Sequence, residues 1–438
     1  MAEVVRWWAP WALPVSAPPA PNVLVTVDGG RIVELVARVS RERARELGAQ
    51  LHDGCVLAPG FVNAHAHLEY AAYDALVDGL SFAEWIGDHI HRKRRLSPEQ
   101  MRAGAEYGAA VAVHAGITTV GDASFSGDAA HAMDAMGLRG RVYLELFGGL
   151  DADAARASLR GALDRLTDLP SSSLLAHGLS PHAPYTVGEP LYRAVAEHGL
   201  PWMTHLLESE DELAFVRGTG GLHASLQRAG VPIPRWERAP LDALADVLSP
   251  EAVLVHVVQA GPRAFEQIAS TGAAVAHCPR SNARLGCGRF DLATADRAGL
   301  LVGLGTDSPA SAGPLDPFAE LRSALEQHRA AARDAGWPTL ARLHRLATLD
   351  AAQVLGYDDL GSLDIGAHAD LIAVHVGACD DPLAAFVLGG SPGDVRAVMV
   401  AGRDRGVRDR TLLEAARARV ADARTMLALP VRRAASHV

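Results

Sequence analysis

The chain has 438 residues, of which 49% are hydrophobic and 21% charged, a composition that excludes disorder and collagen-like repeats. Its formal net charge of -10 argues against nucleic acid as a partner, because such binding needs clustered cations that neutralise phosphates. Nowhere do about 18 apolar residues run together, so we expect neither a membrane span nor a membrane partner.

Cysteine usage and the first residues indicate the compartment. The four cysteines lie far apart and form no Cys-x-x-Cys pair, which predicts neither a disulfide framework nor a zinc ribbon. Residues 1–14 are rich in tryptophan but contain Arg6, Pro10 and Pro14, so they lack the unbroken apolar stretch of a signal peptide. We therefore expect a cytoplasmic protein.

The two ends of the chain carry strand patterns. Residues 23–27 and 31–36 flank a glycine turn and predict a β-hairpin, and residues 369–374 and 395–400 predict further strands. Neither end has enough apolar surface to fold alone, so we predict that residues 1–57 and 359–438 form one small β-sandwich domain. The sequence leaves open whether residues 412–429 pack on this chain or on a neighbour in a homo-oligomer.

Residues 58–358 alternate short apolar runs with longer helical stretches, the pattern of parallel strands joined by crossover helices. Eight runs predict an α/β fold, a (β/α)8 barrel of the TIM type; they are residues 61–62, 117–120, 142–144, 174–176, 202–204, 253–255, 274–276 and 301–304. Polar residues follow nearly every run, and barrel strand ends converge on one mouth; they are His65, Asp122, Glu145, His177, His205, His256, His277 and Asp307. A doubly wound sheet stays possible, but it would bring the strand ends to a line rather than a ring.

The sharpest local signal is the pair His65 and His67. Side chains one residue apart on a strand project to the same side and reach one ion. His205 supplies a third imidazole at the fifth strand end, and Asp307 supplies a carboxylate at the eighth. Taken singly, His205 also fits a core histidine and Asp307 a helix N-cap. Together the four predict a mononuclear catalytic site for one divalent metal ion, Zn2+ or Fe2+, with a position left for water.

Two more residues complete a mechanism. Glu208 follows His205 by three residues, where a carboxylic acid can exchange protons with a substrate held over the metal. His256 ends the sixth strand and faces the same mouth. The acidic residues 210–212 fit a solvated first helical turn.

Lys93 is the only lysine of the chain, and this limits the chemistry. We place it in a helix ahead of the second strand, away from the strand ends, which excludes a P-loop, a pyridoxal Schiff base and a barrel aldolase. Position 177, taken as the fourth strand end, is histidine. The bridging carbamylated lysine of two-metal barrel hydrolases is therefore excluded.

These motifs lead to a family resemblance that covers nearly the whole chain. Residues 59–67 (PGFVNAHAH), the pair His205 and Glu208, His256 and residues 305–307 (GTD) are similar to the amidohydrolase superfamily. The likeness is to its mononuclear branch, which contains cytosine, guanine and adenosyl-type deaminases and the triazine chlorohydrolases. It implies a metal held by His65, His67, His205 and Asp307, and catalytic proton transfer by Glu208, His256 and Asp307.

The resemblance also implies a reaction. Water activated by the metal attacks an amino-bearing ring carbon while Glu208 protonates the adjacent ring nitrogen. His256 orients the nucleophile and stabilises the tetrahedral intermediate. Asp307 accepts the proton of the water and helps to pass it to the departing ammonia.

Weaker motifs point to the substrate. Residues 8–14 (WAPWALP), 67–70 (HLEY), 278–282 (CPRSN) and 306–311 (TDSPAS) are most similar to the 6-amino-6-deoxyfutalosine deaminases of menaquinone biosynthesis. Residues 180–186 (SPHAPYT) are shared with the S-adenosylhomocysteine and methylthioadenosine deaminases. We therefore expect a small-molecule nucleoside substrate, with these last two and guanine as alternatives to aminodeoxyfutalosine.

Five residues are candidates for substrate binding: Glu69 on the ribose hydroxyls, Phe82 or Trp85 over the purine ring, and His182 and Arg280 on the polar tail. An arginine fork suits the benzoate carboxylate of aminodeoxyfutalosine. Phe82 and Trp85 fit the core face of a helix equally well, and Arg280 also fits a role within its own loop.

Two other classes of function stay open at this point. One is dechlorination or amide cleavage at a related centre, which an assay for released ammonia would separate from deamination. The other is a non-catalytic binding protein on the same scaffold, which metal analysis would reveal by the absence of bound zinc or iron.

Overall fold

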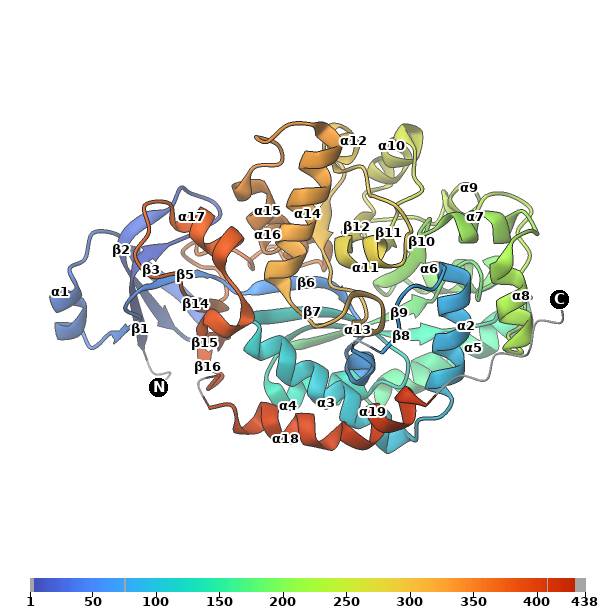
Figure 1. The fold of residues 1–438 in the computed structure, drawn as a ribbon, viewed down its shortest axis with the longest axis horizontal. Helices are drawn as coiled ribbons and strands as arrows, with labels where there is room; N and C mark the ends of the chain where they lie inside the picture. Colours follow the sequence, from blue (N-terminus) through green and yellow to red (C-terminus); the bar gives the residue numbers. More distant parts are fainter. Residues whose placement is uncertain (1–3, 75, 408, 430–438) are drawn as a thin grey trace.

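The computed structural model describes residues 4–74, 76–407 and 409–429 and contains two sheets (Figure 1). The strands of one sheet run parallel, each paired with the next in chain order; they are β6 (Phe61–Ala66), β7 (Ile117–Ser124), β8 (Arg139–Leu146), β9 (Leu175–Pro181), β10 (Trp202–Leu206), β11 (Ala252–His256), β12 (Ala274–His277) and β13 (Val302–Leu304). Each of the eight apolar runs contributes to one strand. The expected (β/α)8 barrel is confirmed.

Helices of the barrel connect these strands and cover its outside (Figure 1). They are η1 (Leu68–Tyr73), α2 (Phe82–Lys93), α3 (Pro98–His114), α4 (Asp128–Met136), α5 (Ala152–Thr167), α6 (Glu189–His198), α7 (Glu210–Val216), α8 (Gly221–Arg228), α9 (Pro240–Leu244), α10 (Pro262–Thr271), α11 (Pro279–Arg284), α12 (Leu292–Arg297), α13 (Pro309–Ala312), α14 (Pro317–Ala332), α15 (Leu340–Leu346) and α16 (Leu349–Val354).

The fourth strand ends later than the sequence suggested. β9 continues to Pro181, so His177 lies near its start, where Nε2 is 3.0 Å from the carbonyl oxygen of Pro170. The assignment of position 177 to the strand end was wrong, because the second half of β9 carries small and polar residues rather than an apolar run. The true end, residues 180–182, contains no lysine, so the exclusion of a bridging lysine is unaffected.

A side chain helps to close the barrel between its first and last strands. The Asn63 amide nitrogen donates to Thr306 Oγ1 at 2.7 Å, and Asn63 Oδ1 accepts from the Thr306 backbone at 2.9 Å. One parallel bridge, between Ala66 and Asp307, adds to this junction. The junction therefore lies beside two of the candidate metal ligands.

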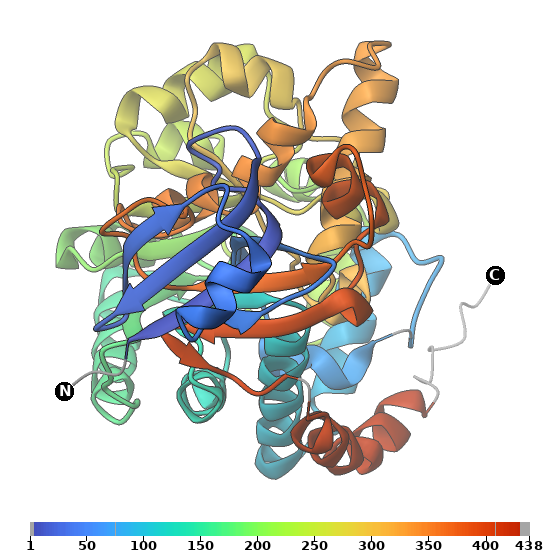
Figure 2. The same cartoon turned by 90° about the vertical axis from the view of Figure 1, so that its left-hand side faces the viewer.

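The second sheet combines both ends of the chain. Figure 2 shows the amino-terminal strands, in blue, beside the carboxyl-terminal strands, in orange-red. They are β1 (Val5–Ala12), β2 (Ala20–Asp28), β3 (Arg31–Val36), β4 (Gln50–Leu51), β5 (Cys55–Pro59), β14 (Leu371–His375), β15 (Val395–Val400) and β16 (Arg403–Asp404), with the short helices α1 (Arg41–Glu46) and α17 (Pro382–Ala384) between them. One face of this mixed sheet buries its own apolar core. The small β domain built from both ends is thus present as a single mixed sheet.

Gly60 alone separates the two sheets at their first junction. β5 belongs to the mixed sheet and ends at Pro59, two residues beyond the expected boundary, and β6 starts the barrel at Phe61. A Cβ atom at position 60 would lie 2.1 Å from Thr118 Cγ2, so only glycine allows the chain to pass this close to β7.

The last two helices pack on their own chain. α18 (Thr411–Arg419) and α19 (Ala421–Ala428) lie along α3, and the buried Val420 and Leu427 contact the cluster that contains Tyr70 and Tyr73. This answers the question left open for residues 412–429, while residues 1–3 and 430–438 of the expected β domain lie outside the described part. Among the described residues, no helix combines the length and apolar character needed to cross a membrane.

Candidate metal centre and active site

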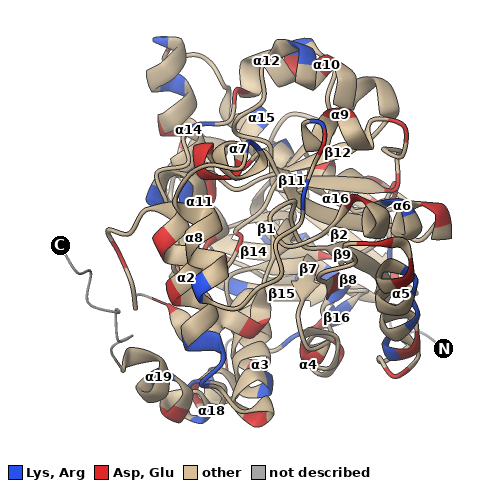
Figure 3. Cartoon of the chain, turned by 90° about the vertical axis from the view of Figure 1, so that its right-hand side faces the viewer, with Lys and Arg blue, Asp and Glu red and all other residues tan. Residues whose placement is uncertain are grey.

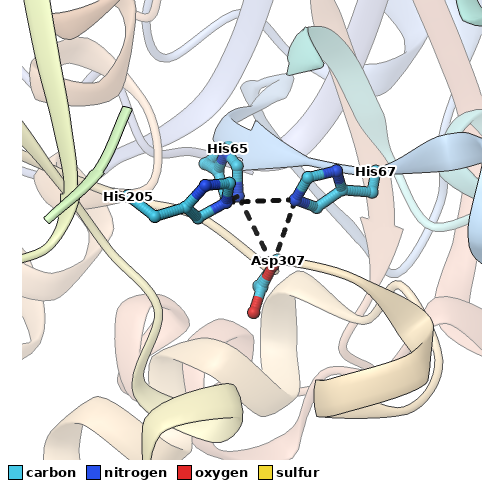
Figure 4. Close-up of side chains that lie close together, drawn as sticks. All are labelled: His65, His67, His205 and Asp307. Atoms are coloured by element: carbon cyan, nitrogen blue, oxygen red, sulfur yellow. Dashed lines mark hydrogen bonds and ion pairs between the residues drawn. The ribbon is translucent and has the colours of Figure 1, made fainter. Parts of the chain in front are cut away.

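Four ligand atoms from three strand ends meet at the barrel mouth (Figure 4). His205 Nε2 lies 3.3 Å from the Nε2 atoms of both His65 and His67. Asp307 Oδ1 lies 3.4 Å from His65 Nε2 and 3.6 Å from His67 Nε2. Ligands about 2.0–2.1 Å from one tetrahedral ion are separated by about 3.4 Å, so this donor set fits a single divalent metal.

Backbone carbonyls orient the imidazoles. His67 Nδ1 lies 2.8 Å from the carbonyl oxygen of Ala123, and His205 Nδ1 lies 2.8 Å from that of His182. A carbonyl only accepts, so each Nδ1 carries the proton and each Nε2 presents its lone pair to the ligand cluster. Burial lowers the pKa of His67 well below its usual value and that of His205 to about 4, so both rings are neutral at pH 7, as metal binding requires.

The approach of the eighth strand to the first depends on Gly305. A Cβ atom at this position would lie 2.9–3.0 Å from the backbone nitrogen and Cβ of His65. Asp307 then turns toward the cluster with a φ of +58°, a left-handed conformation that costs a non-glycine residue free energy and is tolerated mainly at functional sites. Its second oxygen, Oδ2, accepts hydrogen bonds from the hydroxyls of Ser281 and Ser311.

Glu208 and His256 lie against the ligand cluster. Glu208 Oε1 is 3.4 Å from His256 Nε2, and both side chains are buried. Burial, with the neighbouring charges of Asp307 and Glu212, raises the pKa of Glu208 well above its usual value. Burial therefore favours the protonated form of this carboxyl group, which is the form that a general acid needs.

Asn282 sets the tautomer of His256, and the sequence analysis assigned it no role. Its amide nitrogen lies 2.9 Å from His256 Nδ1. An amide NH2 only donates, so Nδ1 accepts and Nε2 carries the proton that faces Glu208. Burial lowers the pKa of His256 to about 3, so the ring stays neutral.

Glu212 is buried, which corrects its expected place on a solvated helical turn. It is 1% exposed, and its carboxylate accepts the backbone N–H groups of Leu207 and Glu208, both at 2.9 Å. It thereby holds the loop that presents Glu208. The Ser-x-x-Glu spacing of residues 209–212, typical of a helix start, was the available signal.

A cavity of about 350 Å3 opens above the ligand cluster. His67, His205, Glu208, His256 and Asp307 line its floor, and α2 lines one wall. Of the expected substrate contacts, the structure brings two to this cavity, Trp85 and His182.

The other three, Glu69, Phe82 and Arg280, do not line this cavity. Glu69 is 2% exposed, and its carboxylate accepts hydrogen bonds from Ser124, Phe125 and Ser126, so it holds the loop after β7 instead of ribose. Phe82 packs in a separate apolar cluster. Arg280 donates to the carbonyl oxygens of residues 312 and 314 and pairs with Glu320, so it ties down its own loop.

The comparison of sequences points to one family. Residues 56–404 match the Amidohydrolase family. A Haloarcula marismortui protein named 5-methylthioadenosine/S-adenosylhomocysteine deaminase is 32% identical over 82% of this chain and 81% of its own length. A protein of the same name from Pyrococcus abyssi is 27% identical over 86% of this chain and 88% of its own length.

Solved structures share the whole architecture. An adenosine deaminase from Xanthomonas campestris with bound zinc has a TM-score of 0.79 at 25% identity and covers 96% of this chain and 98% of that one. An aminofutalosine deaminase from Helicobacter pylori, in complex with methylthio-coformycin, has a TM-score of 0.78 at 23% identity and covers 91% of this chain and 99% of that one. Both the barrel and the mixed sheet therefore have counterparts in known folds.

Proposed function

Because this chain belongs to the amidohydrolase family, we propose that it is a metal-dependent hydrolytic deaminase of adenine nucleosides. That it is a hydrolase acting on carbon–nitrogen bonds follows from the family and from the deaminases it is similar to. One observation carries the finer proposal: the buried carboxyl group of Glu208 lies on the cavity floor beside the four-residue metal cluster, and burial raises its pKa.

The proposed metal is one divalent ion, Zn2+ or Fe2+. His65, His67, His205 and Asp307 would hold it, since neutral imidazoles with one carboxylate suit both metals. When bound, such an ion lowers the pKa of water from 15.7 to about 7 and so makes a nucleophile available at neutral pH.

The protein side chains would then move protons. Glu208 donates to the purine ring nitrogen next to the amino-bearing carbon, which makes that carbon electrophilic. His256 Nε2–H orients the attacking oxygen and stabilises the charge that develops on it. Asp307, with Oδ2 held by two serine hydroxyls, takes up the proton that the water releases and passes it to the leaving ammonia.

The substrate we favour is 6-amino-6-deoxyfutalosine, converted to futalosine with release of ammonia, in menaquinone biosynthesis in the cytoplasm. The motifs at residues 8–14, 67–70, 278–282 and 306–311 support this choice, and four cysteines that stand far apart in the sequence without a Cys-x-x-Cys pair fit a reducing compartment. The names of the relatives favour a second candidate, S-adenosylhomocysteine or methylthioadenosine. Both candidates are nucleosides whose 5′ substituent extends away from the reacting ring.

The test is release of ammonia from a panel of 6-amino-6-deoxyfutalosine, S-adenosylhomocysteine, methylthioadenosine, adenosine, guanine and a chlorotriazine. We expect ammonia from at least one nucleoside, loss of activity after chelation, and recovery with one equivalent of Zn2+ or Fe2+. Chloride release from the triazine, with no ammonia from any nucleoside, would favour the dechlorination alternative. Metal-loaded protein inactive on the whole panel would contradict the proposal.

A further inference from the structure

The single lysine of the chain lies in the cavity, contrary to the expectation that its position ahead of the second strand keeps it from the site. Lys93 is the last residue of α2 and lines the cavity together with Trp85 and His89. These residues are four apart, so one face of the helix points into the cavity. Lys93 does lie on a helix ahead of the second strand, as expected. That helix, α2, lines the cavity, and Lys93 is its last residue.

Aromatic rings surround the ammonium group. Lys93 Nζ lies 3.7 Å from the ring centroid of Phe125 and 5.7 Å from those of Phe147 and Tyr70, and 3.3 Å from the Tyr70 hydroxyl oxygen. Phe125 and Phe147 follow β7 and β8, and each keeps more than a third of its surface exposed. The cation is thus held at the entrance of the cavity by groups that carry no full negative charge.

Within the described residues, no carboxylate oxygen lies within 4.0 Å of Nζ. Glu145 and Glu69 act on Lys93 only from a greater distance. Burial lowers the pKa of Lys93, and the negative charges of Glu145 and Glu69 oppose this shift. Since no carboxylate in the described part of the chain contacts the ammonium group directly, an anion that enters the cavity can bind it beside the aromatic rings.

The choice of residue type supports a role in binding. Every other cation of this chain is arginine, and Arg92, Arg94 and Arg95 already supply positive charge at the end of α2. The ammonium group of lysine is a compact point charge, and here it lies 3.7 Å from the centroid of the Phe125 ring. Figure 3 shows Lys and Arg, in blue, interspersed with Asp and Glu, in red, over the outer helices on this side of the molecule.

We propose that Lys93 determines substrate specificity by binding a carboxylate at the far end of the nucleoside substrate. The inference rests on the proposed deaminase function and deepens it. It selects nucleosides whose 5′ substituent carries a carboxylate, on either an aryl group or an amino acid, over those whose 5′ substituent carries none. The aryl carboxylate also suits the exposed faces of Phe125 and Phe147.

The kinetic test compares substrates within each variant. The ratio of kcat/KM for 6-amino-6-deoxyfutalosine over methylthioadenosine should fall about 10- to 100-fold in Lys93→Met, the range of a charge-assisted hydrogen bond, and recover partly in Lys93→Arg. The matched control is Arg94→Met, which removes the adjacent cavity-lining cation and should change the ratio less than about 3-fold. The same ratio for S-adenosylhomocysteine over methylthioadenosine, measured in parallel, shows whether Lys93 also binds an amino-acid carboxylate or only the aryl carboxylate. An unchanged ratio in Lys93→Met, or a larger loss in Arg94→Met, would overturn the assignment.

A second measurement does not depend on turnover. Feeding lysine labelled with 13C at Cε gives one lysine cross-peak, because the chain has one lysine. Benzoate should shift this peak and neutral benzamide should not, while acetate separates binding of the carboxylate from binding of the ring. If the chemical shift of this cross-peak does not change when benzoate is added, the proposal is overturned even in an active enzyme. A shifted peak in a protein that deaminates no nucleoside would instead refute the proposed function alone.

Discussion

At the level of single residues, burial and neighbouring groups shift the pKa values of the carboxyl groups of the site in opposite directions. Glu208 and Glu212 lie four residues apart and are both nearly inaccessible to solvent, and burial raises the pKa of Glu212 to about 7. Asp307 is buried as well, but its hydrogen bond to His65 and the nearby imidazoles outweigh the effect of burial and hold its pKa well below the usual value. The site thus combines a carboxyl group whose protonated form is favoured with one whose ionised form is favoured.

The role of Glu208 leads to the first prediction. Glu208→Gln should lower kcat about 10²- to 10⁴-fold, because the amide has no proton to transfer, while metal content should stay at the wild-type level. Glu210→Gln, on the exposed side of the same turn, is the control and should keep wild-type kcat. Steady-state kinetics and metal analysis check both variants. A Glu208→Gln enzyme with wild-type kcat would remove the general acid from the mechanism.

The tautomer of His256 leads to the second prediction. Asn282→Leu keeps a similar volume but loses the donor to Nδ1, so the Nε2–H tautomer is no longer enforced. We expect kcat to fall about 10- to 100-fold with little change in KM or metal content. Asn282→Asp should lower kcat further than Asn282→Leu, because the aspartate carboxylate accepts a hydrogen bond from Nδ1 and so favours the tautomer with the proton on Nδ1. If both variants match the wild type, Asn282 does not position His256.

At the level of helices and strands, neutral buried histidines couple stability to pH. His344 on α15 is 3% exposed and packs against Phe386, with ring centroids 5.2 Å apart. Burial lowers its pKa to about 4. In the unfolded chain this histidine has a pKa of about 6.5 and binds a proton, whereas in the folded protein it stays neutral down to about pH 4. Proton binding therefore favours the unfolded state, and the free energy of unfolding falls as the pH drops from about 6.5 to 4.

The third prediction isolates this contribution. Between pH 7 and pH 5, His344 should account for about 2 kcal/mol of lost stability, and His344→Phe should remove that share. Thermal unfolding across this range should show a flatter dependence of Tm on pH than in the wild type. His131→Phe, at an exposed position of α4, is the control and should leave the slope unchanged. Equal slopes in His344→Phe and the wild type would contradict the prediction.

At the level of the whole molecule, a buried ion pair joins the barrel to the mixed sheet. Arg139, the first residue of β8, donates to both carboxylate oxygens of Asp370, at 2.8 and 3.2 Å. Asp370 precedes β14 and also accepts the backbone N–H of Ala401. Both side chains of the pair are almost fully buried, on the side of the barrel away from the candidate site.

The fourth prediction concerns this link. Arg139→Met leaves Asp370 buried and unpaired, which should cost about 3–5 kcal/mol and lower Tm measurably, while kcat at 25 °C stays near wild type. The double variant Arg139→Met/Asp370→Asn removes the charge but keeps the acceptor for Ala401, and should recover most of the loss. A double variant no more stable than the single one would show that the cost is not an unpaired charge.

Sequence alone determined the barrel, the family and the four metal-cluster residues. Each of these signals is local, because the apolar runs mark the strands and His65, His67, His205 and Asp307 stand where strands end. Residues on strand ends meet at one mouth in any closed barrel, so no further knowledge of packing was needed.

Only the tertiary structure decided which residues reach the cavity and which are buried. Glu69 and Arg280 stand in suggestive motifs, but their polar atoms are used by neighbouring loops. Lys93 lines the cavity because one face of α2 forms part of its wall, and Asn282 contacts His256 because α11 lies beside the end of β11. Such roles depend on contacts between segments far apart in the chain, and the pattern of a single segment carries no information about what covers it.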